Sequence, residues 1–297
     1  MLRLALSPRA TRFVRSVTSV ASVSPSPKTG RRVLVPEYPL KRMPGKSVSI
    51  EVAEYSDYDV IDRFSFEHFS KLESASQGVG SNPAVLHEQV VRKIMNSCLR
   101  YPYSTLAFDG DELVGFNLMN IECYDQNMDV PPLGLDDFGD LEKKLFEGSD
   151  LTDQNIRYVA TLLYYATNIT PHFLPKKDNK QYAAHGEMVC VRRDYKGNGL
   201  LGAMLQQSCV AVHEHGFADY LMGNPTTIAT CSASEQLGAA KVWELKYKDV
   251  KFNGKHVYKN ADDKASVSLN LGLITDAVKS RYTEKYTSGD SVLWLYN

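Results

Sequence analysis

The chain of 297 residues lacks the features that mark several large classes of protein. It has almost no net charge, with 34 Lys and Arg against 35 Asp and Glu and a formal net charge of −1. Nucleic-acid and membrane-surface binders need a clear basic excess instead. No apolar run approaches the roughly 18–20 residues of a membrane span. We therefore expect neither nucleic acid nor membrane among its partners.

Cysteine is scarce as well, and its spacing argues against two kinds of stabilising framework. The five cysteines are odd in number, and no two of them are separated by just two residues. Disulfide-bonded domains and zinc sites generally need such pairing. The pattern favours free thiols in a reducing compartment, and we expect no bound metal. The cysteines are Cys98, Cys123, Cys190, Cys209 and Cys231.

Acidic residues are absent from the first 36 residues, which are rich in Arg and Ser. At a helical 100° per residue, Leu6, Phe13 and Val17 fall on one side of this segment, opposite several arginines. An amphipathic, acid-free leader of this composition is typical of a mitochondrial transit peptide. We therefore predict a mitochondrial location. A basic leader without a targeting role, on a cytoplasmic protein, is the alternative.

Residues 22–46 are rich in Ser, Pro, Lys and Arg, which is typical of a linker. We therefore predict a disordered leader and linker over 1–46 and one folded domain over 47–275. Residues 276–297 would form a C-terminal extension. No internal repeat is evident.

Strands and helices are expected in a mixed order. An alternating strand over 48–52 precedes helical stretches near 57–69 and 83–99, and a hairpin joins 104–108 to 113–121. A helix over 153–166, a strand over 185–191, a helix over 200–214, a strand over 217–222 and a helix over 232–237 follow. Asn253-Gly254 predicts a hairpin between 242–251 and 255–258, before a last strand over 265–271. This order predicts an α/β (α+β) fold with a mixed central sheet flanked by helices.

The loop Gly197–Gly202 fits the Gly-x-Gly-x-x-Gly pattern of dinucleotide-binding folds. Two features argue against that reading. Five residues separate the predicted strand end, Val191, from Gly197, whereas Rossmann glycines follow their strand directly. The rest of the chain also offers hairpins rather than further strand–helix units. Two glycines that open a helix can instead place backbone amides and the positive helix end against a diphosphate.

At this loop the chain resembles the GNAT acetyltransferase superfamily, whose signature is Gln/Arg-x-x-Gly-x-Gly/Ala. Lys196 stands in place of Gln or Arg, and Leu201 in place of the final Gly or Ala. The resemblance implies that acetyl-CoA, or another short acyl-CoA, is the co-substrate. The residues that would bind it are Val189, Cys190, Val191, Lys196, Gly197, Asn198, Gly199, Leu200 and Leu201.

Later segments are similar to the arylalkylamine N-acetyltransferases of insects and their nematode relatives. Ala233–Ala239 resembles the Phe-Glu-Lys-Leu-Gly-Phe helix end of the superfamily, and Lys241–Lys255 resembles a strand and glycine turn of the insect-type enzymes. The resemblance covers most of 48–273 and is strongest over 186–260. It implies a GNAT fold and transfer of an acetyl group to a small amine, such as an arylalkylamine.

Acetylation of an amine needs a base, because an ammonium group is not nucleophilic at neutral pH. In the insect-type family the base is a glutamate in a Phe-Phe-x-x-Glu-Pro-Leu stretch, which aligns with His68–Ala75 and implies that Glu73 is the base. The family's partner hydroxyls align with Thr226 and Thr230. The plain structural readings are a charged helix end for Glu73 and a helix cap for Thr226.

His185 and Glu187 are the rival candidates for the base. Two-residue alternation places them on one face of the cofactor strand together with Val189 and Val191. Many GNAT enzymes carry their base on this strand, and an imidazole has a suitable unperturbed pKa.

The expected function is direct transfer from acyl-CoA to a small-molecule amine, by a protein that we expect to be monomeric. Tyr158, Tyr164 and Tyr165 are candidates for the wall of an aromatic-amine pocket. Two alternatives stay open. One is a non-catalytic acyl-CoA-binding protein of GNAT fold, favoured by Leu201 and the altered surroundings of Glu73. The other is an acetyltransferase that acts on a protein or a polyamine.

Overall fold

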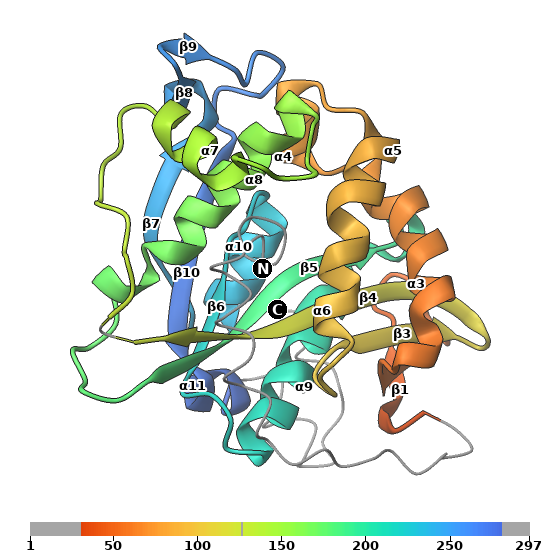
Figure 1. Ribbon diagram of the computed structural model, residues 1–297. Helices are drawn as coiled ribbons and strands as arrows, with labels where there is room; N and C mark the ends of the chain where they lie inside the picture. The colour runs from red at the N-terminus through yellow and green to blue at the C-terminus, as the bar shows by residue number, and fades with distance from the viewer. Residues whose placement is uncertain (1–30, 126, 281–297) are drawn as a thin grey trace.

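The computed structural model describes residues 31–125 and 127–280, and an eight-stranded sheet runs through this part (Figure 1). Its order is β1-β2-β3-β4-β5-β6-β10-β7, and only the β5–β6 pair is parallel. The strands are β1 (Val33–Pro39), β2 (Ser47–Val52), β3 (Thr105–Asp109), β4 (Glu112–Tyr124), β5 (Gln181–Val191), β6 (Tyr220–Gly223), β7 (Ala240–Lys246) and β10 (Ser266–Leu273). A separate hairpin consists of β8 (Lys251–Phe252) and β9 (Lys255–His256).

Helices cover both faces of this sheet. The first group is α3 (Tyr58–Ser65), the π-helical turn Phe66–Ser70, α4 (Ser74–Val79), α5 (Pro83–Leu86), the π-helical turn His87–Val91, α6 (Arg92–Cys98), α7 (Gly139–Phe146) and α8 (Gln154–Asn168). The second group is α9 (Leu200–Glu214), α10 (Ile228–Gln236) and α11 (Ile274–Val278). α3 and α6 pack on one face of β4, and α9 packs on the other. The expected α/β (α+β) fold is confirmed.

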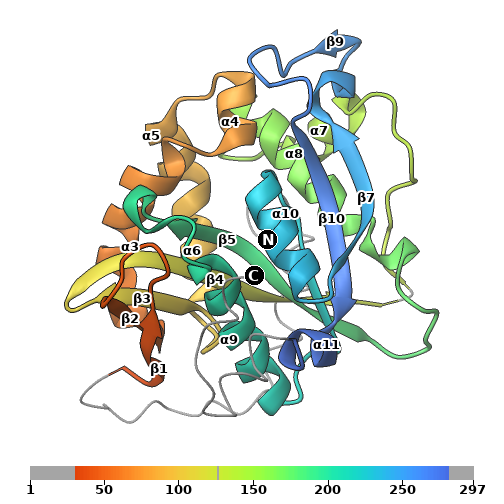
Figure 2. The ribbon, with the colours of Figure 1, turned by 180° about the vertical axis from the view of Figure 1, so that it is seen from behind.

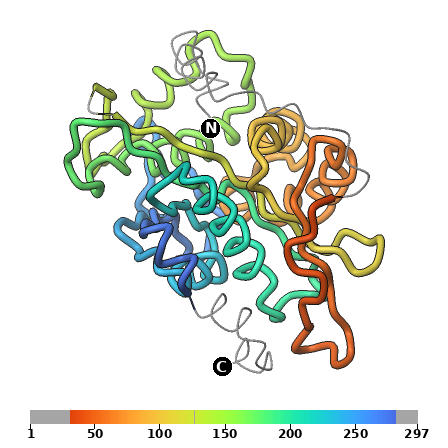
Figure 3. The backbone as a smooth tube through the Cα atoms, turned by 90° about the horizontal axis from the view of Figure 1, so that it is seen from below, coloured from red at the N-terminus to blue at the C-terminus, as the bar shows by residue number. Residues whose placement is uncertain are grey.

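The two edges of the sheet lie at opposite sides of the molecule, with β1 and β2 at one side and β7 and β10 at the other (Figure 2). Seen from below, α9 lies between the N-terminal hairpin, formed by β1 and β2, and the C-terminal elements β10 and α11 (Figure 3). The central strand β4 is buried over most of its length because helices cover both of its faces. No helix of 31–125 or 127–280 is long and apolar enough to cross a membrane.

The residues expected to form a linker contain strand β1. It pairs with β2 in antiparallel orientation, and Val35 and Tyr38 are buried. The prolines at 36 and 39 are tolerated because β1 is an edge strand and its pairing is irregular. The composition indicated a linker because proline argues against a strand inside a sheet. Only an edge strand tolerates it, and the sequence does not show that these residues lie at the edge of a sheet. The folded region therefore begins before Ser47, and the predicted boundary at 46 is wrong.

The C-terminal half departs from expectation in two places. The Asn253-Gly254 turn is present, but it joins strands of only two residues each. The preceding strand β7 pairs with β10 instead, and a short 3-10 turn, Tyr247–Asp249, separates it from the hairpin. The predicted extension over 276–297 begins inside α11, where Ala277 is fully buried. Residues 1–30, for which a mitochondrial targeting role was predicted, and residues 281–297 lie outside the described residues.

Candidate functional site

The central sheet opens between its two parallel strands. β5 and β6 pair only where Ala183–Gly186 faces Tyr220–Gly223. β5 then continues to Val191, whereas β6 ends at Gly223. Beyond Gly186 one edge of β5 therefore has no neighbouring strand among residues 31–125 and 127–280, so its backbone groups on that side can bind a ligand. A cavity of about 530 Å³ lies at this opening.

The glycine loop forms one end of the cavity. Gly197 and Gly199 both have left-handed backbones, with φ of 80° and 75°. Gly199 directly precedes the first turn of α9, whose free backbone N–H groups and positive dipole end suit an anion. The predicted helix over 200–214 has the bounds of α9. The mostly antiparallel sheet is not the doubly wound parallel sheet of dinucleotide-binding proteins.

Eight of the nine residues predicted to bind the cofactor line this cavity: Val189, Cys190, Val191, Lys196, Gly197, Gly199, Leu200 and Leu201. Asn198 does not line it. Its side chain is buried and accepts a hydrogen bond from the Arg42 backbone N–H (2.7 Å), while its amide group donates to the Tyr195 carbonyl (2.9 Å). Asn198 therefore stabilises the loop and does not face the cavity. This role could not be predicted from the sequence, because its partner Arg42 lies 156 residues away.

Alanine at position 199 is expected to strain the loop and to weaken binding of CoA. A left-handed backbone costs a non-glycine residue about 1–2 kcal/mol, and a Cβ at Gly199 would lie 2.8 Å from the Tyr38 hydroxyl. Thermal unfolding and calorimetric titration with CoA measure the two effects. Gly216→Ala is the matched control, because Gly216 also has positive φ but its Cβ would contact nothing within 4 Å. Equal losses of stability and of CoA affinity in both variants would contradict this role of the loop.

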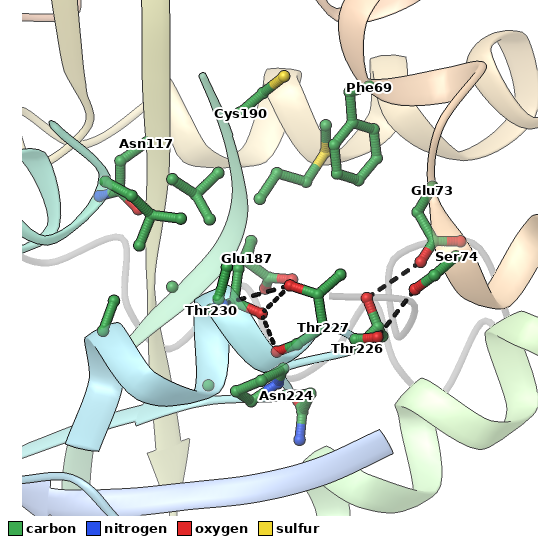
Figure 4. Close-up of a pocket in the computed structure, with 18 of the residues that line it drawn as sticks. Phe69, Glu73, Ser74, Asn117, Glu187, Cys190, Asn224, Thr226, Thr227 and Thr230 are labelled. Atoms are coloured by element: carbon green, nitrogen blue, oxygen red, sulfur yellow. Dashed lines mark hydrogen bonds between the residues drawn. The ribbon is translucent and has the colours of Figure 1, made fainter. Parts of the chain in front are cut away.

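Glu73 and Thr226, which are 153 residues apart in sequence, also line the cavity, and their side chains meet there (Figure 4). The Thr226 hydroxyl donates to Glu73 Oε1 at 3.2 Å. Glu73 is also the N-cap of α4 and accepts hydrogen bonds from the backbone N–H groups of Ala75 (3.0 Å) and Ser76 (2.6 Å). This carboxylate therefore caps α4, as the structural alternative predicted, and it also lines the cavity.

Ser74 is a site residue that the sequence reasoning missed. Its hydroxyl donates to the Thr226 backbone carbonyl at 2.8 Å, beside the bond between Thr226 and Glu73 (Figure 4). Ser74 replaces the proline that follows the glutamate in the related family. The sequence signal for Ser74 was thus a hydroxyl group next to the predicted base. In the structure this hydroxyl connects the start of α4 to the segment before α10 by a hydrogen bond.

Thr230 lines the cavity but does not reach Glu73. Its hydroxyl lies 2.9 Å from the Thr227 hydroxyl and also donates to the Thr227 carbonyl. Thr227 caps α10 by accepting from the Thr230 backbone N–H, so the cap reading proposed for Thr226 is wrong by one residue. The helix thus begins four residues earlier than the predicted 232–237.

Only one of the three candidate tyrosines faces the cavity. Tyr164 lines it, whereas Tyr158 and Tyr165 do not. The Tyr158 ring packs 4.3 Å from that of Phe252, and the Tyr165 hydroxyl donates to the Pro132 carbonyl. Tyr158 and Tyr165 therefore belong to the core.

The cofactor strand contains a β-bulge at Glu187. Its neighbours Gly186 and Met188 pair with consecutive residues of β4, Met119 and Leu118, so Glu187 is the extra residue. A bulge of this kind shifts the alternation of side chains along a strand by one position.

The face expected to hold His185, Glu187, Val189 and Val191 together is therefore divided, and that prediction is wrong. Val189 and Val191 pack with the cluster under α9. A side chain at Gly186 would also point towards α9, so the residues on either side of it point to the opposite face. Gly186, a glycine inside the predicted strand and directly before Glu187, is a local signal of a bulge that the strand prediction did not use.

His185, Glu187 and Glu122 form a buried ionisable cluster next to the cavity. His185 Nδ1 lies 3.1 Å from Glu187 Oε1 and 3.8 Å from Glu122 Oε1. The closer pair is near enough for an ion pair but is not aligned for a hydrogen bond. Burial alone would lower the pKa of His185, but the charges and contacts of Glu187 and Glu122 outweigh it and raise this pKa to about 9.

Cys190 is the cysteine of the described residues that lines the cavity. Burial raises the pKa of its thiol to about 12, and Lys196 offsets only part of this. The thiol also donates to the His68 carbonyl. It therefore stays protonated at neutral pH and is not an activated nucleophile.

No family model and no curated protein matches the chain, but solved structures do. It is similar to arylalkylamine N-acetyltransferase 2 from Aedes aegypti, with 16% identity, a TM-score of 0.59, and coverage of 76% of this chain and 99% of that chain. The polyamine N-acetyltransferase of Drosophila melanogaster, which catalyses the formation of N-acetylagmatine, matches at 13% identity and TM-score 0.57, over 75% and 98%. The C-terminal condensation domain of Ebony, in complex with β-alanyl-dopamine, matches at 13% and 0.52, over 77% and 99%. The chain therefore has the fold of the GNAT N-acetyltransferases, as its sequence resemblance indicated.

Proposed function

We propose that this protein transfers an acyl group, most simply acetyl, from a short acyl-CoA to a small amine. One observation carries the proposal: a single cavity is lined both by the glycine loop and by the Glu73–Thr226 pair. The loop suits a diphosphate, and the pair supplies a carboxylate for proton transfer. Two substrates can thus meet between them.

The binding roles follow from the backbone. The amides of the loop and the first turn of α9 would donate to the diphosphate of CoA, and the open edge of β5 beyond Gly186 would pair with the amide groups of the pantetheine arm. Both binding roles depend on backbone groups. Lys196 and Leu201 differ from the family signature in their side chains, so these differences leave both roles intact.

The chemistry assigned to Glu73 is removal of a proton from the ammonium group, directly or through a water molecule. The free amine then attacks the thioester carbonyl carbon, and the carbon–sulfur bond breaks. The nitrogen gives up its second proton as the amide forms, and CoA leaves as a thiolate that takes up a proton. Thr226 holds the carboxylate in place with its hydroxyl. Transfer is direct, because Cys190 is protonated at neutral pH and no acyl-enzyme is needed.

The amine site is acidic and partly aromatic. Glu73 and Glu187 line the cavity with Phe69 and Tyr164, which suits a cation that carries an apolar group. Solved structures of this fold include enzymes whose names specify arylalkylamines and polyamines. An arylalkylamine is the first candidate substrate, and a polyamine is the second.

Incubation of the full chain with radiolabelled acetyl-CoA and a panel of amines tests the proposal. The panel contains tryptamine, dopamine, agmatine, spermidine and glycine. Label transfer to at least one amine above the rate without enzyme is the expected result. Tight CoA binding without transfer to any amine would favour a non-catalytic acyl-CoA-binding protein, and the absence of CoA binding would reject both readings.

A further inference from the structure

Arg42, in the connection 40–46 between β1 and β2, lies directly against the glycine loop. Its guanidinium group occupies the space that a side chain at position 197 would need. The residue is exposed, and its side chain makes no hydrogen bond or ion pair with any residue of 31–125 and 127–280. A cation therefore lies beside the proposed diphosphate loop, and no described residue accepts a hydrogen bond from its guanidinium group.

The backbone beneath this cation is held firmly. The Arg42 N–H donates to Asn198 Oδ1 at 2.7 Å, and the Tyr38 hydroxyl donates to the Asn198 carbonyl at 3.0 Å. Asn198 and Tyr38 are each 1% exposed. These contacts fasten the β1–β2 hairpin to the loop beside the N-terminal end of α9, where Figure 3 also places the hairpin.

The surroundings of Arg42 suit an anion. Lys196 is a second exposed cation on the loop. The carboxylate of Asp109 is already engaged by the Tyr195 hydroxyl (2.5 Å) and by Lys46 (4.0 Å). Arg42 does not line the cavity, but Gly197, against which its guanidinium lies, does. An acyl-CoA whose diphosphate is bound by the loop amides would bring its phosphate groups close to Gly197 and hence to this guanidinium.

We propose that Arg42 binds phosphate groups of acyl-CoA, so that the N-terminal hairpin is part of the co-substrate site. This inference rests on the proposed function. A guanidinium presents a fixed fork of donors that matches the oxygens of a phosphate group. The loop amides and Arg42 would then hold the nucleotide half from two sides.

Calorimetric titration of wild type and Arg42→Gln with CoA, and with dephospho-CoA, tests the inference. We expect Arg42→Gln to weaken CoA binding by about 10- to 100-fold, the range for a charged hydrogen-bonded contact. If the 3′-phosphate is the group bound, wild type prefers CoA over dephospho-CoA and the variant loses this preference. If the diphosphate is bound, the variant loses affinity for both ligands equally.

Arg100→Gln is the matched control. Arg100 is also exposed, and it is close in sequence to Tyr103. The Tyr103 hydroxyl contacts His215 at the C-terminal end of α9. This end of the helix is about 20 Å from the glycine loop at its N-terminal end. The Arg100→Gln variant should bind CoA with the affinity of wild type. The Arg42 substitution keeps the backbone N–H that Asn198 needs, and equal unfolding temperatures would verify this. Arg42→Lys, which keeps the charge but not the fork, should recover only part of the affinity.

Two failures can be told apart. If wild type binds CoA and Arg42→Gln binds it equally well, the role of Arg42 is rejected and the proposed function stands. If wild type itself does not bind CoA, the proposed function fails before the variant is considered.

Discussion

Replacing Glu73 by glutamine is expected to lower kcat/KM for acetyl transfer by about 10²- to 10⁴-fold, the usual contribution of a general base. The amide has nearly the same size but cannot take up a proton. CoA affinity should stay close to wild type, because Glu73 bonds to Ala75, Ser76 and Thr226 and to no residue of the glycine loop among the contacts of the described residues. Initial rates at saturating acetyl-CoA, together with calorimetric titration of CoA, measure the two quantities.

The substitution also disturbs the N-terminus of α4, and this effect must be separated from catalysis. Glu73 accepts three hydrogen bonds, and a glutamine can keep those made to its carbonyl oxygen. The loss of one bond costs about 1 kcal/mol of stability, which thermal unfolding would reveal. Glu67→Gln is the control, because Glu67 is an exposed neighbour in sequence that pairs only with Lys71 among the described residues.

A different pattern would relocate the base. If Glu73→Gln keeps its rate while Glu187→Gln loses it, the proton is taken up by the cluster on β5 rather than by the start of α4. If neither substitution affects the rate, the family's mechanism does not apply to this chain.

The glycine loop could be predicted from the sequence because its signal is local. Two glycines before an amphipathic helix determine a left-handed turn and a free helix end, and both are present. The offset of the loop from its strand was enough to exclude the dinucleotide reading. By contrast, the proximity of Glu73 and Thr226 could not be derived from either segment alone. It came from the family resemblance, and the structure brings the two side chains together.

The features that the sequence did not indicate depend on contacts between distant segments. Strand β1 contains Pro36 and Pro39 and is stable only because it occupies a sheet edge beside β2. The bulge at Glu187 depends on how β5 pairs with β4, because the neighbouring Gly186 permits a bulge but does not by itself determine one. Each of these also shapes the site: β1 carries the hairpin that contacts the loop, and the bulge determines where Glu187 points.

The stability of the protein is expected to fall between about pH 6.5 and pH 9 through the titration of His185. Its pKa is raised to about 9 in the folded protein, against about 6.5 in an unfolded chain. A raised pKa means that the folded state holds the proton more tightly, so the gain is complete below about pH 6.5 and is lost as pH rises through 9. The lost stability is about 3 kcal/mol. Urea unfolding at several pH values measures it.

His185→Gln is the control for this titration, because it removes the group and should flatten the change in that pH range. Glu187→Gln should lower the pKa of His185 from its wild-type value, because burial then opposes the charged imidazole with one partner fewer. The carbon NMR signal of the imidazole follows this pKa directly. A wild-type value near 6.5 would contradict the ion pair.

The same titration separates the two candidate bases. An imidazole with a pKa of about 9 is protonated at neutral pH and cannot take a proton from the amine. If His185 were the base, kcat/KM would rise with pH until it levelled off near 9, and Glu187→Gln would move that rise to lower pH. If Glu73 is the base, Glu187→Gln leaves the position of the pH profile unchanged even though it shifts the His185 signal. A profile that moves with the His185 signal would transfer the catalytic role from Glu73 to the buried cluster.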